Sequence, residues 1–141
     1  MASVYDLIKG RETYHADVNQ TVMEVARLLV EKNIGAVAVL DQGQLAGIFS
    51  ERDLMRRVVV AGLDARNVKI SEVMSKDPLT VSPDVGLDEC MVLMKKHGFR
   101  HLPIARGKEL LGVISLRDLL LQEVTEKHGE VQMMRAYIAG S

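Results

Sequence analysis

The sequence of 141 residues contains one cysteine, Cys90, and no apolar run that approaches the length of a membrane-spanning helix. A single cysteine excludes an intramolecular disulfide and a zinc site made of cysteines. A membrane helix needs about 18 or more predominantly apolar residues. The N-terminal residues also lack the basic segment and apolar run of a signal peptide. The sequence therefore favours a soluble, cytoplasmic protein with no membrane partner.

The sequence also has no excess of positive or negative charge. The 18 lysines and arginines nearly balance the 19 aspartates and glutamates, and the formal net charge is −1. A strong basic field is what attracts nucleic acid or anionic membranes, so we expect neither as a partner. The sequence has no glycine-rich phosphate loop, no Cys-x-x-Cys pair, and no nucleophile with a nearby base. We therefore predict a binding protein that requires no metal, and not an enzyme.

What the sequence does contain is an internal repeat with an offset of 65 residues. Residues 45–54 read LAGIFSERDL and residues 110–119 read LLGVISLRDL, so six of the ten positions are identical. One repeat of this size would bury only about 60% of the surface that its unfolded chain exposes, so we expect the two to fold as one packed unit. The predicted division is a first repeat over 1–65, a second repeat over 66–127 and a helical tail over 128–141.

Both repeats show the same order of periodicities. Residues 22–29 carry apolar side chains at the i, i+3, i+4 and i+7 positions of a helix, and Thr21 with Glu24 forms a capping box before it. The equivalent stripe over residues 87–94 places Cys90 on a buried helix face. Two apolar strands joined by a glycine-containing turn follow in each repeat.

The last helix of each repeat begins at the repeated serine and is expected to end near residues 61 and 127, with Gly62 terminating the first. Pro103 cannot donate a ladder hydrogen bond, so its strand should start there or lie at an edge. The predicted class is α/β (α+β), with two repeats of strand-helix-strand-strand-helix related by a pseudo-two-fold axis.

The most strictly repeated feature is a polar triplet that follows the second strand of the pair. Its members are Ser50, Arg52 and Asp53 in the first repeat and Ser115, Arg117 and Asp118 in the second. A serine before a helix, with an acidic residue three positions later, caps that helix. A carboxylate at the end of a strand can also accept both hydroxyls of a ribose, and the free amides of a helix start favour an anion. Doubling of the motif favours a ligand site, while capping alone remains the alternative.

Both copies of the motif resemble the signature of cystathionine-β-synthase (CBS) domains, which occur in tandem as a Bateman module. The copies are Gly47-Ile48-Phe49-Ser50-x-x-Asp53-Leu54 and Gly112-Val113-Ile114-Ser115-x-x-Asp118-Leu119, and the resemblance covers about Val4 to Thr125. It implies that each motif aspartate binds the ribose of an adenosine-type ligand, helped by the motif serine. It also implies that the adenine lies between apolar segments of both repeats and that modules pair into a flat disc. The residues that would line these sites are Ile34, Gly35, Ala36 and Val37, then Phe99, Arg100, His101, Leu102 and Pro103, with His15 and Thr80 from the first strands.

The resemblance further implies that the two sites differ. In the repeat register, Arg100 and His101 stand opposite Gly35 and Ala36. In family members such as the γ subunit of AMP-activated protein kinase, this basic pair faces the phosphate of the ligand held by the other repeat's aspartate. The cations expected near Asp53 are then Arg52, Arg56, Arg100 and His101, whereas Asp118 has mainly Arg117. The alternative is that these cations are solvated or pair with Glu24, Glu51 or Glu89.

These observations predict a stand-alone tandem CBS protein that binds an adenine nucleotide and acts through a regulated partner protein or its own oligomeric state. AMP is the first candidate ligand, and ADP, ATP, NAD(H) and S-adenosylmethionine remain open. A homodimer is expected because the apolar triplets at 58–60 and 119–121 spread over more than one helix face. The alternative function is a ligand-free dimerisation scaffold or an enzyme accessory subunit.

Overall fold

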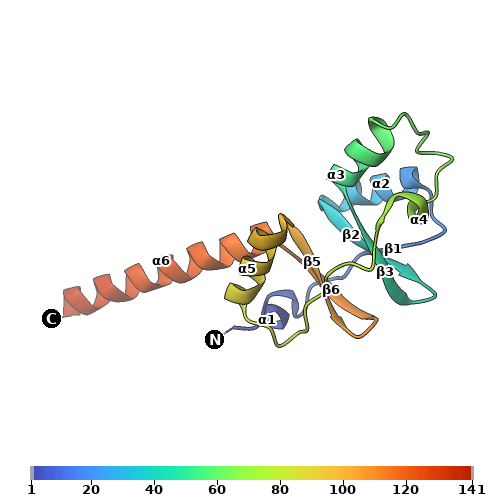
Figure 1. Ribbon diagram of the computed structural model, residues 1–141. Helices are drawn as coiled ribbons and strands as arrows, with labels where there is room; N and C mark the ends of the chain where they lie inside the picture. Colours follow the sequence, from blue (N-terminus) through green and yellow to red (C-terminus); the bar gives the residue numbers. More distant parts are fainter. Residues whose placement is uncertain (1, 141) are drawn as a thin grey trace.

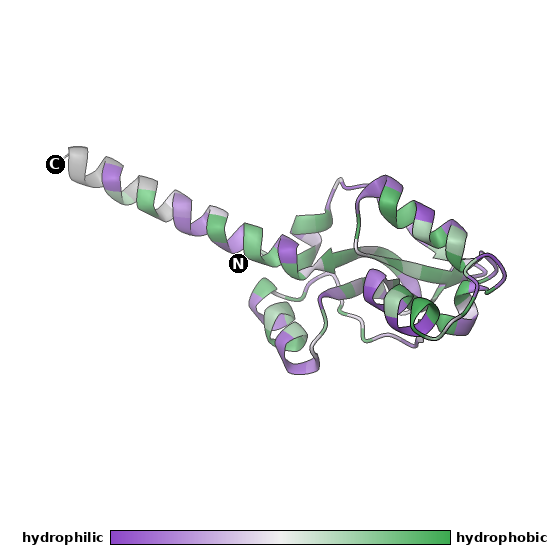
Figure 2. Ribbon diagram, turned by 90° about the horizontal axis from the view of Figure 1, so that it is seen from above, coloured by the Kyte–Doolittle hydropathy of each residue, from purple (hydrophilic) through white to green (hydrophobic). Residues whose placement is uncertain are grey.

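The computed structural model describes residues 2–140, apart from the side chains of residues 130, 132, 133 and 136–140. Two halves of mixed helix and strand lie side by side, and a long terminal helix projects from the second half (Figure 1). The hydrophobic strands run through the interior, and the helices around them present many hydrophilic residues (Figure 2). The mixed helix and strand class predicted from the sequence is confirmed.

The first half is built on a four-stranded sheet. Its elements are β1 (His15–Asp17), α2 (Val22–Lys32), β2 (Ala36–Asp41), β3 (Gln44–Ser50), α3 (Glu51–Asp53), the π-helix η1 (Leu54–Val59), α4 (Ile70–Val73) and β4 (Ser75–Lys76). The strand order is β1-β2-β3-β4; β1 pairs with β2 in parallel, and the other pairs are antiparallel. The backbone of Gly62, with φ of 73°, adopts the left-handed conformation expected after the helix.

The second half repeats this plan with a smaller sheet. It contains α5 (Leu87–His97), β5 (His101–Arg106), β6 (Glu109–Ser115) and α6 (Leu116–Gly140). In place of a first strand it has one parallel bridge, between Val81 and Ile104, at the same register as the pair of Ala16 with Val39. The strand β5 therefore has β6 along one edge and only this bridge on the other, which accommodates the missing amide hydrogen of Pro103.

Local sequence signals explain how these elements begin and turn. Thr21 Oγ1 accepts a hydrogen bond from the Glu24 amide at 3.2 Å, and the Glu24 carboxylate accepts one from the Thr21 amide at 3.3 Å, so the predicted capping box is confirmed. Both residues of the β2–β3 turn, Gln42 and Gly43, have positive φ angles of 51° and 82°. That conformation suits a tight two-residue connection between twisted strands.

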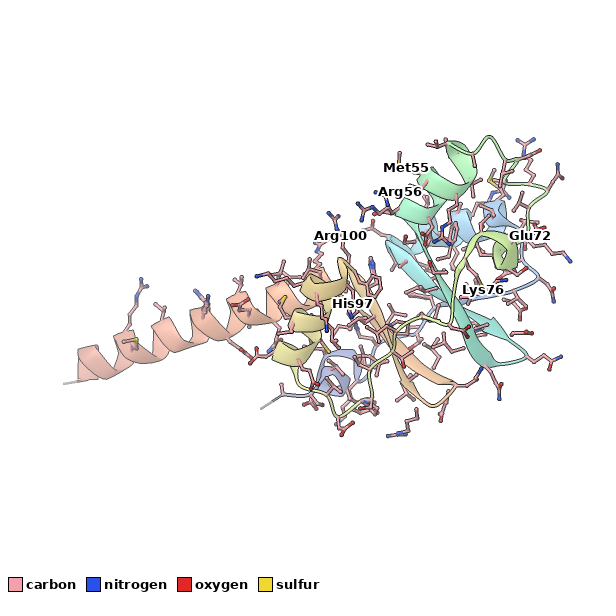
Figure 3. All side chains as sticks on the ribbon, in the orientation of Figure 1. Met55, Arg56, Glu72, Lys76, His97 and Arg100 are labelled. Carbon is pink, nitrogen blue, oxygen red and sulfur yellow. The ribbon has the colours of Figure 1, made fainter. Side chains whose placement is uncertain are left out.

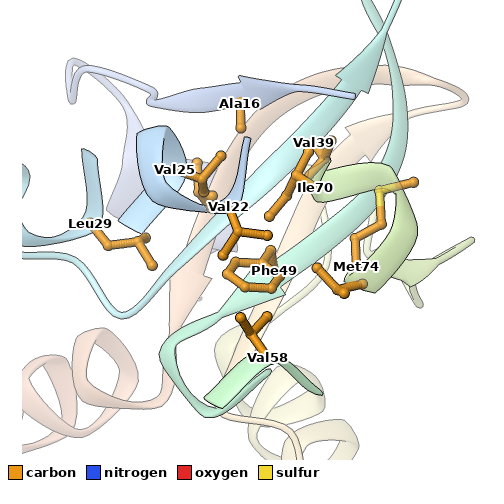
Figure 4. Close-up of a cluster of buried hydrophobic side chains, with 11 residues drawn as sticks. Ala16, Val22, Val25, Leu29, Val39, Phe49, Val58, Ile70 and Met74 are labelled. Atoms are coloured by element: carbon orange, nitrogen blue, oxygen red, sulfur yellow. The ribbon is translucent and has the colours of Figure 1, made fainter. Parts of the chain in front are cut away.

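The core of the first half packs against β2 and β3 and is covered by α2 and α4 (Figure 4). Val22 and Val25 of α2 are fully buried there against Phe49 of β3, and Val58 of η1 closes the far side. A separate core fills the second half, around Leu102, Ile104 and Ile114. A small third cluster of Ala38, Leu45 and Ala105 joins the halves, where the Leu45 amide donates to the Lys108 carbonyl oxygen at 2.8 Å.

Two short helices are exchanged between the halves. The helix α1 (Val4–Ile8) precedes the first repeat, yet Val4 and Ile8 are buried in the core of the second half. The helix α4 precedes the second repeat, yet Ile70 and Val73 are buried in the core of the first. Residues 4–8 (VYDLI) resemble residues 70–74 (ISEVM) at an offset of 66, but this likeness does not show that each turn packs on the other repeat's strands.

A glycine in β3 and a glycine in β6 accommodate the exchanged segments. A Cβ atom at Gly47 would lie 2.5 Å from Met74 Sδ, and one at Gly112 would lie 2.8 Å from Ile8 Cδ1. Both distances are shorter than real Cβ contacts allow. The repeated glycine of the motif, three residues before the motif serine, therefore lets the exchanged segment approach the strand closely.

The end of α6 differs from the prediction. The last helix was expected to stop near Lys127 before a separate tail, but α6 continues without a break to Gly140. Its 25 residues correspond to about 37 Å. No proline interrupts this segment, and a single glycine at position 129 costs only about 1 kcal/mol in a helix. Among the described residues, no helix is both long enough and apolar enough to cross a membrane.

Candidate functional site

The repeated serines and aspartates form two similar hydrogen-bonded pairs at the ends of β3 and β6. The amide and the Oγ of Ser50 donate to Asp53 Oδ2 at 2.9 and 3.0 Å, and the Asp53 amide donates to Ser50 Oγ at 3.2 Å. The Ser115 amide donates to Asp118 Oδ2 at 2.8 Å, and the Asp118 amide donates to Ser115 Oγ at 3.0 Å. Both motifs therefore cap their helices, and each cap leaves the Oδ1 oxygen of the aspartate for another partner.

The partners of the two Oδ1 oxygens differ between the repeats. Arg57 Nε lies 3.8 Å from Asp53 Oδ1, which is beyond hydrogen-bond distance, and its Nη1 donates to the Val73 carbonyl oxygen at 3.0 Å. Arg11 binds Asp118 with both terminal nitrogens, Nη1 to Oδ1 at 3.0 Å and Nη2 to Oδ2 at 3.3 Å. We call Ser50, Asp53 and Arg57 the Asp53 site, and Ser115, Asp118 and Arg11 the Asp118 site.

The electrostatics of Asp118 follow from these contacts. Burial raises the pKa of its carboxyl group, but the hydrogen bonds from Arg11 and from the Ser115 amide and hydroxyl together outweigh burial. The net pKa of Asp118 is below its ordinary value, so this carboxylate is ionised throughout the neutral range.

His101 lies where the two halves meet. A Cβ atom at Gly35 would be 3.3 Å from His101 Cε1 and 3.4 Å from Glu51 Oε1, so the imidazole reaches the first repeat from the start of β5. Burial lowers the pKa of His101 and Arg100 lowers it further, against the opposing effects of Asp118 and Glu51. The imidazole therefore lies beside Gly35 and Glu51 of the first repeat and also feels the charge of Asp118, while its net pKa is below the ordinary value.

The turns before β2 and β5 are held to the helices of the motif. The Glu51 amide donates to the Gly35 carbonyl oxygen at 2.9 Å, and the Leu116 amide donates to the Arg100 carbonyl oxygen at 2.7 Å. These bonds recur at the 65-residue offset. They place the first residues of β2 and β5 beside the motif serines, with Ala36 paired to Ser50 and His101 paired to Ser115.

The predicted apolar lining is only partly brought to these strand ends. Val37 and Leu102 are fully buried within the cores of their own repeats, and they lie on the strand face opposite to that of the preceding residues, Ala36 and His101. Ile34 packs against the first core as well. Pro103 is buried opposite Val113 of β6. Phe99 is partly exposed and stacks on His97, with ring centroids 5.3 Å apart.

The remaining predicted residues lie at the surface. His15 is exposed at the start of β1, paired with Ala38, while Thr80 is half-buried next to the Val81 bridge. The exposed arginines of the prediction are Arg52, Arg56, Arg100 and Arg117. Figure 3 shows Arg56 on η1 and Arg100 before β5, both on the side of the molecule that carries the motif helices. The arginine that lies beside Asp53 is Arg57, next to the predicted Arg56.

Two other features of the chain do not coincide with this arrangement. A depression of about 310 Å³ lies at the opposite ends of the strands, beside Gln42, Lys76 and Lys108, and none of the predicted residues lines it. His97 and His101 have the spacing His-x-x-x-His, but His97 ends α5 and His101 begins β5. Within the part of the chain that the structure describes, no three His, Cys, Asp or Glu side chains are grouped to hold a metal ion.

Comparison with known proteins decides the family. A sequence model of the CBS domain matches residues 4–60 and, again, residues 70–123. The chain belongs to the CBS domain family. Its resemblance to a tandem pair of CBS domains is thereby confirmed, and the strand ends just described are those of a CBS-domain pair.

Relatives and solved structures agree with this assignment. The mitochondrial CBS domain-containing protein CBSX3 of Arabidopsis thaliana is 32% identical over 127 residues, which are 86% of this chain and 62% of CBSX3. A solved structure of a protein with CBS domains from Burkholderia ambifaria is 36% identical, with a TM-score of 0.83 over 88% of this chain and 95% of that one. CBSX2, solved in complex with AMP, has the same fold, with 21% identity and a TM-score of 0.77 over 90% of this chain and 99% of its own.

Sequence reasoning missed two residues of this CBS-domain pair. Arg11 lies in the connection after α1, outside the motif, and no repeated arginine marks its position, because Lys76 and Asp77 stand opposite it at offsets of 65 and 66. The four-residue spacing of Asp53 and Arg57 on one helix face was the available signal for the second residue. Position alone could not show that Arg57, rather than Arg56, turns toward the carboxylate.

Proposed function

We propose that this CBS-domain pair is a regulatory module that binds an adenine nucleotide at the Asp53 site, with AMP as the first candidate ligand. The observation that carries the proposal is the state of the Asp53 carboxylate. The helix cap fixes its Oδ2, and the cation beside its Oδ1, Arg57, is 3.8 Å away, beyond hydrogen-bond distance. A fixed, partly exposed carboxylate oxygen can accept the hydroxyls of a ribose, as the acidic residue of dinucleotide folds does.

The surrounding charge supports a phosphorylated ligand. Arg52, Arg56 and Arg100 are exposed and lie within or close to the motif turns. Guanidinium groups bind phosphate through two parallel hydrogen bonds. CBS-domain pairs are nucleotide-binding regulatory modules, and the AMP complex of CBSX2 supports AMP as a ligand of this fold. ADP, ATP, NAD(H) and S-adenosylmethionine share the ribose and remain candidates.

Calorimetric titration of ligand-stripped protein with these five ligands tests the proposal. Asp53→Ala should weaken binding more than tenfold, because charge-assisted hydrogen bonds contribute about 1.5–3 kcal/mol and about 1.4 kcal/mol is tenfold. Asp53→Asn, which can retain the cap, separates loss of charge from loss of structure. Asp41→Asn, at the exposed hairpin end, is the matched control and should bind as the parent does. If the parent binds none of the ligands, the ligand-free scaffold replaces the proposed function.

We also propose that the module acts as a homodimer through its motif helices and reports the ligand to a regulated protein. In the apolar triplets of these helices one residue is buried, Val58 at 1% and Leu119 at 3%, while Val59, Val60 and Leu121 are more than half exposed. Adjacent exposed apolar residues favour a partner surface. Light scattering should return twice the chain mass of 15.6 kDa. Val60→Glu should shift the mass to the monomer, whereas Lys108→Glu, on a hairpin turn, should not.

A further inference from the structure

Asp53 and Asp118 occupy equivalent positions and have equivalent serine caps. Of the two carboxylates, the one that an arginine of the same chain binds through both oxygens is Asp118. The guanidinium of Arg11 covers both oxygens of Asp118, at 3.0 and 3.3 Å. The nearest cation to Asp53 Oδ1 is 3.8 Å away and donates elsewhere, to the Val73 carbonyl oxygen. The two repeats therefore differ in the acceptors that they leave for a ligand.

The position of Arg11 is fixed by the strand that carries the Asp118 site. Its Nη2 also contacts the Val113 carbonyl oxygen at 3.4 Å, and Thr13 Oγ1 donates to the Leu111 carbonyl oxygen at 3.2 Å. Arg11 follows α1, which packs its Ile8 on Gly112 of the same strand. The connection from α1 to β1 thus runs along β6 and delivers the guanidinium to the carboxylate.

The pair is well placed to resist displacement. The Asp118 side chain is 24% exposed and the Arg11 side chain is 44% exposed, so solvent screens the pair only in part. The two hydrogen bonds are charge-assisted and share one planar donor group. Ribose hydroxyls would also donate charge-assisted bonds to this carboxylate, but they carry no positive charge and could form them only by displacing the guanidinium of Arg11.

We propose that Arg11 closes the Asp118 site to the ribose diol of a nucleoside, so that each chain binds one nucleoside, at Asp53, for as long as the Arg11–Asp118 pair is intact. This inference rests on the proposed function, because it assumes that the motif aspartates bind ribose. Arg11 is then a specificity-determining residue supplied by the connection between the two halves.

Adenosine is the probe for this inference, because it has the diol but no phosphate that could attract Arg11. Calorimetric titration of the full chain should give one equivalent of adenosine for the parent and two for Arg11→Gln. The new equivalent should disappear in Arg11→Gln/Asp118→Ala. Removing the pair should strengthen adenosine binding at Asp118 about tenfold, which corresponds to about 1.4 kcal/mol. Lys9→Gln, an exposed cation two residues away, is the charge-matched control and should remain at one equivalent.

The outcomes separate the inference from the proposed function. One equivalent for both the parent and Arg11→Gln overturns the role of Arg11 and leaves the proposed function intact. Two equivalents for the parent, one of them lost in Asp118→Ala, also overturn it. No adenosine binding to the parent or to any variant overturns this inference, whereas the proposed function fails only if the five adenosine-type ligands tested above also do not bind. If Arg11→Gln unfolds, Arg11→Lys keeps the charge, cannot bind both oxygens with a planar group, and should show a weaker second equivalent.

Discussion

Replacing the repeated glycines by alanine should have unequal effects, although the two positions are equivalent in the sequence. At Gly47 an added Cβ would lie 2.5 Å from Met74 Sδ and 2.8 Å from the Ser75 carbonyl oxygen. At Gly112 the nearest atom is Ile8 Cδ1 at 2.8 Å, and the next atoms are at 3.5 Å or more. A terminal methyl group can rotate away, whereas the Ser75 backbone is paired with Ile48 and cannot retreat without breaking that pairing.

The magnitudes follow from this difference. Overpacking typically lowers the free energy of unfolding by about 1–3 kcal/mol. Replacing glycine by alanine raises it by about 0.4–1 kcal/mol, because alanine restricts the unfolded chain. We expect Gly47→Ala to lower the free energy of unfolding by about 2 kcal/mol, and Gly112→Ala to lower it by less than about 1 kcal/mol. Urea titration followed by circular dichroism measures both values as shifts in the midpoint at constant slope.

A double-mutant comparison identifies the cause. Ile8→Val removes the Cδ1 methyl group, so it should cancel the cost of Gly112→Ala, and the two changes should not be additive. Met74→Ala should leave most of the cost of Gly47→Ala in place, because the Ser75 carbonyl oxygen remains. If Gly112→Ala destabilises the protein as much as Gly47→Ala does, the reasoning from these contacts is refuted.

Two further predictions concern titratable groups. Because burial lowers the pKa of His101, the folded protein binds fewer protons there than the unfolded chain below about pH 6.5, so the free energy of unfolding should fall as the pH drops below that value. His101→Gln should flatten this dependence in urea titrations at a series of pH values, and an unchanged slope would contradict the burial argument. Burial, with a smaller effect of Glu89, raises the pKa of Cys90 to about 11, so the native thiol should resist a disulfide reagent at pH 8 and react once urea unfolds the chain. Prompt labelling of the native protein would show that Cys90 is accessible.

The sequence predicted what depends on local chemistry. The cap of Thr21 with Glu24, the buried stripe containing Cys90, and the turn at Gly43 are each specified by a few neighbouring residues. The capping contacts of the two motifs could also be read from their spacing alone. Each of these features depends on hydrogen bonds or periodicity within about four residues, which the chain order preserves.

What the sequence could not predict depends on contacts between distant segments. Arg11 and Asp118 are 107 residues apart, and a repeat register does not report a contact that only one repeat makes. The exchange of α1 and α4 escaped prediction for a related reason, because the register shows that the two turns are alike but not which strand each one covers. The burial of Val37 in the first core has no alternation signal either, because residues 36–40 of β2 are all apolar.

The exchanged helices also determine how the two repeats can move. A cut between residues 65 and 66 would deprive the first half of Ile70, Val73 and Met74, three of the eleven residues in its core, and would leave Val4 and Ile8 of the second core on the wrong fragment. The chain crosses from the second half to the first after α1, and from the first half to the second after β4. The two connecting segments therefore hold the halves together in opposite chain directions. A ligand that moved the repeats apart would stretch both connecting segments at once. A pulling force applied at the N-terminus would act first on α1 and on β6, the strand against which α1 packs.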